Sequence, residues 1–252
     1  MLKPVDYDDN QHRNYARGRP LLDGARARWM QVFAAHAPAE RPLTVLDLGS
    51  GTGRITTPLA ETFGEAVGVE PSAKMRATAE AATSHPRVRF LAGQAEAIPL
   101  GDDSCDLVLM NVSFHHVRDR PAAAREIARV LKADGRLLMR SPFSDRLPDI
   151  TWHRYFPRAR EVELAMFPTT AEVEALFAKV GLRQLAFETV REPMAESLKA
   201  EAEQMRLRAI STFEHLTEAE IAAGQAALDA AASLETEPQP TYSESDLMVL
   251  GR

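Results

Sequence analysis

The sequence predicts an α/β fold in which helices cover both sides of a parallel sheet. Short runs of β-branched and aliphatic residues, typical of buried strands, alternate with helical segments along residues 43–139. A glycine-rich turn, GSGTG at residues 49–53, follows the first of these runs and leads into a helix. The 252 residues are enough for one domain with a substantial core.

The N-terminal segment is expected to consist of a polar arm and one helix. Residues 1–20 are polar and contain Gly18 and Pro20, which interrupt any regular pattern. In residues 21–37 the apolar side chains recur at three- and four-residue steps, which places them on one face of a helix: Leu22, Ala25, Trp29, Val32 and Phe33. Pro38 ends that helix.

Strands and helices then alternate in a regular order. The expected strands cover residues 43–48, 65–69, 88–91, 106–110 and 136–139. The expected helices cover residues 55–63, the segment that Ser72 can cap, and the segment that Pro121 begins and Gly135 ends. Such alternation favours right-handed crossovers between parallel strands.

The last third of the chain departs from this alternation. A helix is expected over residues 170–180, and strands over residues 182–190 and 242–250. A long helical stretch, rich in Ala and Glu, is expected over residues 193–234. We interpret this stretch as a lid inserted between two late strands, against the alternative of a solvated helical pair without a role. The run WHRYF at residues 152–156 indicates either a wall of a substrate pocket or a loop packed on the core.

Composition and charge favour a small-molecule partner. Lys and Arg number 30 against 36 Asp and Glu, so the net charge of −6 gives no general attraction to nucleic acid or to an anionic membrane surface. The single cysteine, Cys105, excludes an internal disulfide, and no metal site is expected. The opening MLKPVDYDDNQHRN lacks the apolar stretch of a signal peptide, so a cytoplasmic protein is expected. The sequence leaves a monomer and a homodimer both open.

Residues near the glycine-rich turn indicate a ligand site. Gly51 and Gly53 leave room for a polar group of a ligand to approach the backbone and the start of the following helix. Asp47 precedes the turn, where it would repel a pyrophosphate but attract an ammonium group. Glu70 ends the second strand about 20 residues beyond the glycines, where a carboxylate can accept hydrogen bonds from both ribose hydroxyls. An adenosine that carries an amino acid would satisfy both carboxylates.

Five segments carry a more specific signal than the turn alone. They are VLDLGSGTGR (45–54), VGVEPSAKM (67–75), FLAGQAEAIPL (90–100), CDLVLMNVSFHHV (105–117) and REIARVLKADGRLLM (125–139). In order and spacing they resemble the motifs of class I S-adenosylmethionine-dependent methyltransferases of the small-molecule type. The resemblance implies one domain over residues 1–252, a Rossmann-like three-layer sandwich with a seven-stranded, mostly parallel sheet and an antiparallel last strand. Residues 1–37 would lie over the cofactor, and residues 193–234 would form the helical lid.

The resemblance also implies a cofactor, S-adenosyl-L-methionine, and the residues that hold it. Residues around the glycine turn would surround its methionine part, the end of the second strand its ribose, the end of the third strand its adenine, and the end of the fourth strand the methyl channel. In chain order the implied set is Tyr15, Arg19, Asp47, Gly49, Ser50, Gly51, Glu70, Pro71, Met75, Gln94, Ala95, Glu96 and Asn111. Gln94 stands where such enzymes often have an acidic residue, and its side-chain carbonyl can still accept a hydrogen bond from an amine.

The predicted activity is methyl transfer to an oxygen, nitrogen or carbon atom of a small organic acceptor by in-line displacement. His115 and His116 follow the fourth strand and are the candidate catalytic bases, against the alternative that one packs in the fold and the other faces water. Two other functions stay open. One is a non-catalytic protein that keeps the cofactor pocket for regulation. The other is an NAD(P)-dependent oxidoreductase, although its usual G-x-G-x-x-G turn would need Gly or Ala where Arg54 stands.

Overall fold

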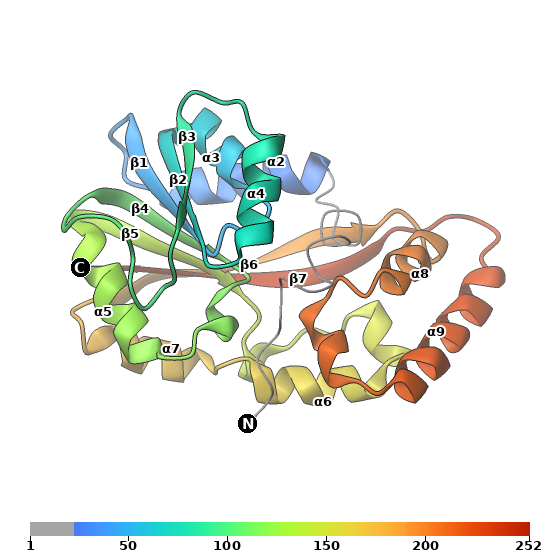
Figure 1. Cartoon of the computed structure of the whole chain (residues 1–252). Coiled ribbons are helices and arrows are strands. Elements are labelled where there is room, and N and C mark those ends of the chain that lie inside the picture. Colours follow the sequence, from blue (N-terminus) through green and yellow to red (C-terminus); the bar gives the residue numbers. More distant parts are fainter. Residues whose placement is uncertain (1–22) are drawn as a thin grey trace. The chain divides into compact units, whose positions relative to one another are not determined.

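The structure is a computed structural model that describes residues 23–252 (Figure 1). It divides into two compact units. The sheet unit contains residues 27–141, 170–188 and 246–252, and the helical unit contains residues 142–169 and 189–245 together with the described residues 23–26. Each unit is described by itself.

Seven strands form one sheet in the order β3-β2-β1-β4-β5-β7-β6. The strands are β1 (Leu43–Leu48), β2 (Gly64–Glu70), β3 (Val88–Ala92), β4 (Cys105–Asn111), β5 (Leu131–Ser141), β6 (Arg183–Ala195) and β7 (Thr241–Gly251). Parallel pairing joins β3 to β2, β2 to β1, β1 to β4 and β4 to β5, whereas β7 runs antiparallel to β5. The predicted mostly parallel seven-stranded sheet with an antiparallel last strand is therefore confirmed.

Helices cover both faces of the sheet unit (Figure 1). They are α2 (Asp23–His36, from Ala27 on in this unit), α3 (Thr56–Phe63), α4 (Ala73–Ala82), α5 (Arg120–Val130) and α7 (Thr170–Ala178). Helices α3 and α4 pack on β1, β2 and β3, and α5 packs on β5 and α7. The central strands β1 and β4 are buried along most of their length, as expected for apolar strands that are covered on both faces. This core holds the carboxyl ends of β1, β2 and β4 at one edge of the sheet.

Two predicted boundaries were wrong. The helix that starts near Pro121 ends at Val130 rather than at Gly135, because Leu131 leaves the helix in an extended conformation and pairs with Cys105 of β4. The strand predicted to end at Val190 continues to Ala195, so Pro193 lies in β6 and not in a helix. Proline is tolerated there because β6 is the edge strand of the sheet, where a missing N–H need not break a ladder hydrogen bond.

The helical unit has an apolar core of its own. Its helices are α6 (Pro157–Met166), which was not predicted, α8 (Leu198–Arg206) and α9 (Glu218–Ser233), with short 3₁₀ turns at Thr151–Arg154 and Ser211–His215. The Trp152 ring stacks on Phe213 at 5.7 Å between centroids, and Phe156 meets Phe213 edge-on at 5.3 Å. Side chains of α8 and α9, including Met205 and Leu228, complete this cluster.

The predicted insertion is therefore not an independent helical pair. Residues 198–233 share one core with residues 150–159, and a Cβ at Gly224 of α9 would lie only 2.3 Å from the Phe156 ring. Of the WHRYF run, Trp152, His153 and Phe156 are buried within this unit. The role of the insertion as a lid stays a prediction. No helix in the described part of the chain is long and apolar enough to cross a membrane.

Candidate functional site

The glycine-rich turn between β1 and α3 is fixed to the end of β2. The amides of Gly49 and Ser50 both donate to the Val69 carbonyl oxygen, at 2.8 and 3.2 Å. The Gly53 amide donates to the Ser50 carbonyl oxygen at 3.0 Å, which closes the turn before α3 begins. The turn thus lies at the carboxyl edge of the sheet, beside the strand that ends in Glu70.

Gly51 and Gly53 both have left-handed backbone conformations, with φ of +56° and +76°, but different surroundings. A Cβ at Gly53 would lie 2.8 Å from Phe90 Cζ and 3.0 Å from Ala79 Cβ, so Gly53 allows the turn to pack on the core. A Cβ at Gly51 would meet no heavy atom of residues 23–252 within 4 Å. Gly51 therefore faces open space, where a ligand can approach the backbone.

This difference predicts distinct effects for two matched alanine substitutions. Gly53→Ala combines backbone strain with overlap against Phe90 and is expected to lower the free energy of unfolding by roughly 2–4 kcal/mol. Gly51→Ala carries only the strain, about 1 kcal/mol, but places a methyl group in the open space. Urea unfolding of both variants measures the difference. Equal losses in the two variants would contradict the packing described for the turn.

Asp47 is a buried carboxylate at the end of β1. Its side chain is 2% exposed and accepts a hydrogen bond of 2.6 Å from the Thr56 hydroxyl at the start of α3. Burial raises the pKa of Asp47 to about 6; the Thr56 hydroxyl opposes this shift, and the negative charge of Glu70 adds to it. A cation beside Asp47 would offset the cost of ionising it, so the environment favours a positively charged group of a ligand.

Glu70 is held in one orientation by two backbone amides. Its Oε2 accepts from the Gly51 amide and its Oε1 accepts from the Ser72 amide, both at 2.9 Å. The side chain is 7% exposed and links the glycine turn to the start of α4. A carboxylate fixed in this way presents acceptors in a set direction, which suits recognition of neighbouring hydroxyl groups.

Two buried hydroxyl oxygens in the same turn have no hydrogen-bond partner among the residues that the structure describes. Ser50 Oγ and Thr52 Oγ1 are both inaccessible to solvent and make no hydrogen bond within the described structure. Unsatisfied buried polar atoms are costly, and in native proteins they commonly contact water or a ligand. Together with Asp47, Glu70 and Gly51, they give the turn the polar donors and acceptors that a polar ligand requires.

The end of β4 lies beside the same turn. The Ser113 hydroxyl donates to the Leu48 carbonyl oxygen at 2.8 Å, and Arg140 of β5 donates to Asn111 Oδ1 at 3.1 Å. Between them Val112 has φ of +57°, a conformation that costs a β-branched residue about 1–3 kcal/mol and that is concentrated at functional sites. The Val112 amide donates to the Arg140 carbonyl oxygen at 2.8 Å, which holds this conformation.

The two candidate catalytic residues lie in the 3₁₀ turn Phe114–His116 that follows β4. The rings of His115 and His116 are 3.8 Å apart between centroids, and both side chains are partly exposed. The His116 amide donates to the Ser113 carbonyl oxygen at 3.0 Å, so the turn is continuous with the end of β4. Both histidines are therefore near the carboxyl edge of the sheet.

The remaining predicted site residues differ from one another in exposure and in hydrogen bonding. Pro71 is exposed, whereas Met75 of α4 is 2% exposed, and its amide donates to the Ser72 hydroxyl that caps the helix. After β3, Gln94 is exposed, Ala95 is buried, and Glu96 Oε1 accepts from the backbone amides of residues 118 and 119. Glu96 thus stabilises the loop that follows the histidine turn through these two hydrogen bonds. Tyr15 and Arg19 lie outside the described residues.

Sequence reasoning missed two residues that organise this edge of the sheet. Thr56 binds Asp47, and Ser113 binds the end of β1. Neither belongs to a local pattern that marks it, because each contact joins segments far apart in the sequence or across a turn. Arg140 of β5 binds Asn111 and lies 4.2 Å from the centre of the Trp29 ring. Among residues 23–252, no group of three or more His, Cys, Asp or Glu side chains is arranged to hold a metal ion.

Comparison with known proteins finds a match over the region that contains this site. Residues 46–139 match a family described as a methyltransferase domain. An uncharacterized methyltransferase of Mycobacterium tuberculosis is 42% identical over 123 residues, which cover 49% of this chain and 46% of the relative. The chain thus spans about half the length of the first curated relatives it matches.

Solved structures match over most of the chain at lower identity. A protein of Anabaena variabilis, named as a methyltransferase from an antibiotic biosynthesis pathway, has a TM-score of 0.72 at 21% identity, covering 90% of this chain and 97% of that one. A phosphoethanolamine N-methyltransferase of Haemonchus contortus, solved with phosphomonomethylethanolamine and S-adenosylhomocysteine, has a TM-score of 0.64 at 17% identity, covering 100% of this chain and 61% of that one. These likenesses show the fold.

Proposed function

We propose, from the match of residues 46–139 to a methyltransferase domain, that the protein transfers the methyl group of S-adenosylmethionine to a small organic acceptor. The observation that carries the proposal is the pairing of two buried carboxylates, Asp47 and Glu70, on either side of an open glycine turn. The Haemonchus enzyme of similar fold, which was solved with S-adenosylhomocysteine, supports the choice of cofactor.

The residues present fit this cofactor. Asp47 would hold the ammonium group of its methionine part, because a buried carboxylate gains most from a cation. Glu70, oriented by the amides of Gly51 and Ser72, would accept hydrogen bonds from the ribose hydroxyls. The unsatisfied hydroxyls of Ser50 and Thr52 would gain partners from the polar groups between these two ends.

When bound, S-adenosylmethionine supplies an electrophilic methyl group on a positively charged sulfur. The protein's residues therefore have to position the acceptor and exclude water rather than generate a reactive group. Asn111, held by Arg140, and the strained Val112 fix the end of β4, which we propose as the border of the methyl channel. His115 or His116 would remove a proton from a hydroxyl or ammonium acceptor.

The proton-transfer role has a direct test. If one of the two histidines is the base, His115→Gln or His116→Gln lowers turnover without changing the affinity for S-adenosylhomocysteine. Unchanged turnover in both variants would show that neither residue acts as the base.

The acceptor class follows from charge and from the site's composition. The net charge of −6 argues against a nucleic-acid acceptor, since the phosphate backbone contributes most to non-specific affinity. We therefore propose a small organic molecule, and we keep the lid role of residues 193–234 as part of this proposal. The shared core of the helical unit means that a deletion of the insertion would expose Trp152 and Phe156, so point substitutions are the suitable test of a lid.

Methyl transfer from labelled cofactor tests the acceptor class. The full chain is incubated with S-adenosylmethionine labelled on the methyl group, together with a small-metabolite extract, RNA or denatured protein in separate reactions. We expect label in the metabolite fraction only, and we expect Asp47→Asn to abolish it. Label in RNA or protein would contradict the acceptor class, and bound cofactor without transfer to any fraction would favour a non-catalytic role.

A further inference from the structure

The chain that leaves β4 is held by both neighbouring strands. In the sheet, β4 lies between β1 and β5. The Val112 amide donates to the Arg140 carbonyl oxygen of β5, and the Ser113 hydroxyl donates to the Leu48 carbonyl oxygen of β1, both at 2.8 Å. Two consecutive residues are thus fixed from opposite sides, and Val112 has the left-handed φ of +57°. A β-branched residue adopts this conformation only where its surroundings impose it.

Ser113 also contacts the glycine-rich turn. Gly49 has φ of +78°, and a Cβ at this position would lie 2.7 Å from Ser113 Cβ and 3.0 Å from Ser113 Oγ. Any side chain at residue 49 would therefore push Ser113 away from the turn. The turn that we propose as the cofactor site and the end of β4 are thus in direct contact through Ser113.

The same serine begins the turn that carries the two histidines. The Ser113 carbonyl oxygen accepts from the His116 amide at 3.0 Å, which closes the 3₁₀ turn Phe114–His116. Phe114 is fully buried, and its ring lies 5.9 Å from the Phe177 ring of α7. This buried ring anchors the turn from its other side. Without the Ser113 hydroxyl the turn should therefore stay folded but lose its fixed position relative to β1.

The glycine-rich turn has support that does not involve Ser113. The amides of Gly49 and Ser50 donate to the Val69 carbonyl oxygen of β2, and the Gly53 amide closes the turn on Ser50. Loss of the Ser113 hydroxyl is therefore expected to change the position of the histidine turn and to leave the shape of the glycine-rich turn as it is.

We propose that Ser113 is a positioning residue for methyl transfer. Its hydroxyl sets the turn of His115 and His116 against the glycine-rich turn, and the left-handed Val112 directs the chain so that this hydroxyl reaches Leu48. This role rests on the proposed function, in which the cofactor lies at the glycine-rich turn and one histidine removes a proton. A displacement of about 1 Å between reacting groups can cost about 100-fold in rate, so a hydrogen bond away from the chemistry can control turnover.

Ser113→Ala separates positioning from cofactor binding. The full chain is assayed for transfer of labelled methyl from S-adenosylmethionine to the small-metabolite extract, and S-adenosylhomocysteine binding is measured by calorimetry. We expect the transfer rate to fall at least about tenfold, because the base is misplaced. The dissociation constant of S-adenosylhomocysteine should change by less than about twofold, because the glycine-rich turn keeps its own support.

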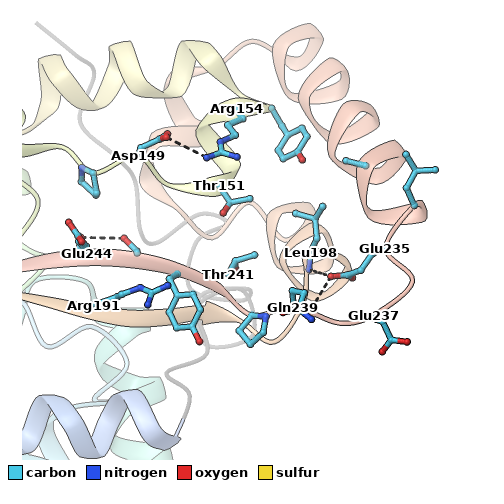
Figure 2. Close-up of a pocket in the computed structure, with 17 residues that line it drawn as sticks. Asp149, Thr151, Arg154, Arg191, Leu198, Glu235, Glu237, Gln239, Thr241 and Glu244 are labelled. Carbon is cyan, nitrogen blue, oxygen red and sulfur yellow. Dashed lines mark hydrogen bonds and ion pairs between the residues drawn. The ribbon is translucent and has the colours of Figure 1, made fainter.

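Two serines provide matched controls, because each also donates to a backbone carbonyl oxygen. Ser104, which precedes β4, donates to Gly101 at 2.7 Å. Ser243 donates to Glu244 at 3.3 Å and lies in a groove of about 770 Å³ within the helical unit (Figure 2). Ser104→Ala and Ser243→Ala should keep the original transfer rate.

The imidazole NMR signals of the full chain, labelled with ¹³C-histidine, report the position of the turn without any turnover. The signals of His115 and His116 are identified by their loss in His115→Gln and His116→Gln. We expect Ser113→Ala to shift or broaden both signals, with and without S-adenosylhomocysteine, and the two control variants to leave them unchanged.

Double variants show whether Ser113 acts through a histidine. Ser113→Ala should add little to the loss caused by the histidine variant that lowers transfer, because both changes remove the same step. Fully additive losses, unchanged transfer or unchanged histidine signals in Ser113→Ala, a loss of cofactor affinity as large as the loss of rate, or unchanged transfer in both histidine variants would overturn the positioning role and leave methyl transfer standing. No transfer by the original chain would instead overturn the proposed function, and this role with it.

Discussion

Glu70→Gln is expected to weaken the binding of S-adenosylhomocysteine by about 100-fold or more, which corresponds to the loss of roughly 3 kcal/mol from charge-assisted hydrogen bonds. The carboxylate accepts from the amides of Gly51 and Ser72. The NH₂ group of a glutamine has to face one of these donors or the ribose, so at least one acceptor is lost. The measurement is calorimetric titration of both proteins.

The same substitution should lower the free energy of unfolding by only about 1–2 kcal/mol, because it removes one backbone-to-carboxylate hydrogen bond from a folded turn. Glu65→Gln is the matched control, since Glu65 lies exposed on the same strand. It should leave both affinity and stability unchanged. A folded Glu70→Gln protein with the affinity of the original chain would show that Glu70 does not hold the ligand.

Asp47→Asn is expected to abolish cofactor binding while leaving the ligand-free protein as stable as before or more stable. The asparagine keeps an oxygen that can accept from Thr56 but removes a buried charge. Because burial raises the pKa of Asp47 to about 6, ionisation of this group destabilises the ligand-free fold at neutral pH. Replacing Asp47 with Asn removes that penalty, so the substitution can raise the free energy of unfolding by at most about 3 kcal/mol. Thermal unfolding and ligand titration of the two proteins separate these effects.

The sign of the pH dependence is fixed by the direction of that shift. The raised pKa means that the folded chain holds the Asp47 proton more tightly than the unfolded chain, so ionisation between the unfolded value and about 6 destabilises the ligand-free fold. The original protein should therefore lose this contribution to stability as the pH rises through that window, and Asp47→Asn should not. Ligand affinity in the original protein should fall as the pH drops below about 6, because the ammonium group requires the ionised carboxylate. If the free energy of unfolding of Asp47→Asn varied with pH in the same way as that of the original protein, this role of Asp47 would be contradicted.

Local sequence patterns were sufficient to predict the strands of the sheet and the glycine-rich turn. The run LTVLDL becomes β1 over Leu43–Leu48, and Ser72 caps α4 as predicted. These features depend on periodicity, glycine and capping chemistry, which operate over a few residues. The strand over residues 242–250 was predicted from its local pattern, and its antiparallel direction, seen in β7, was predicted from the resemblance.

The features that sequence reasoning missed depend on contacts between distant segments. Leu131 leaves its helix because it pairs with Cys105, and β6 continues through Pro193 because it is an edge strand. Helix α6 has a weak apolar stripe and is stabilised by packing in the helical unit, where Ala159 and Val162 are buried. In the site, the left-handed Val112 is imposed by its neighbours against its own preference.

Calorimetric titration of the full chain with S-adenosylhomocysteine and, separately, with NAD is the most direct measurement of what this turn recognises. We expect saturable binding of one S-adenosylhomocysteine per chain and no heat from the dinucleotide, whose pyrophosphate would be repelled by Asp47. Absence of heat from the thioether nucleoside at millimolar concentration, or saturable binding of NAD instead, would contradict the assignment.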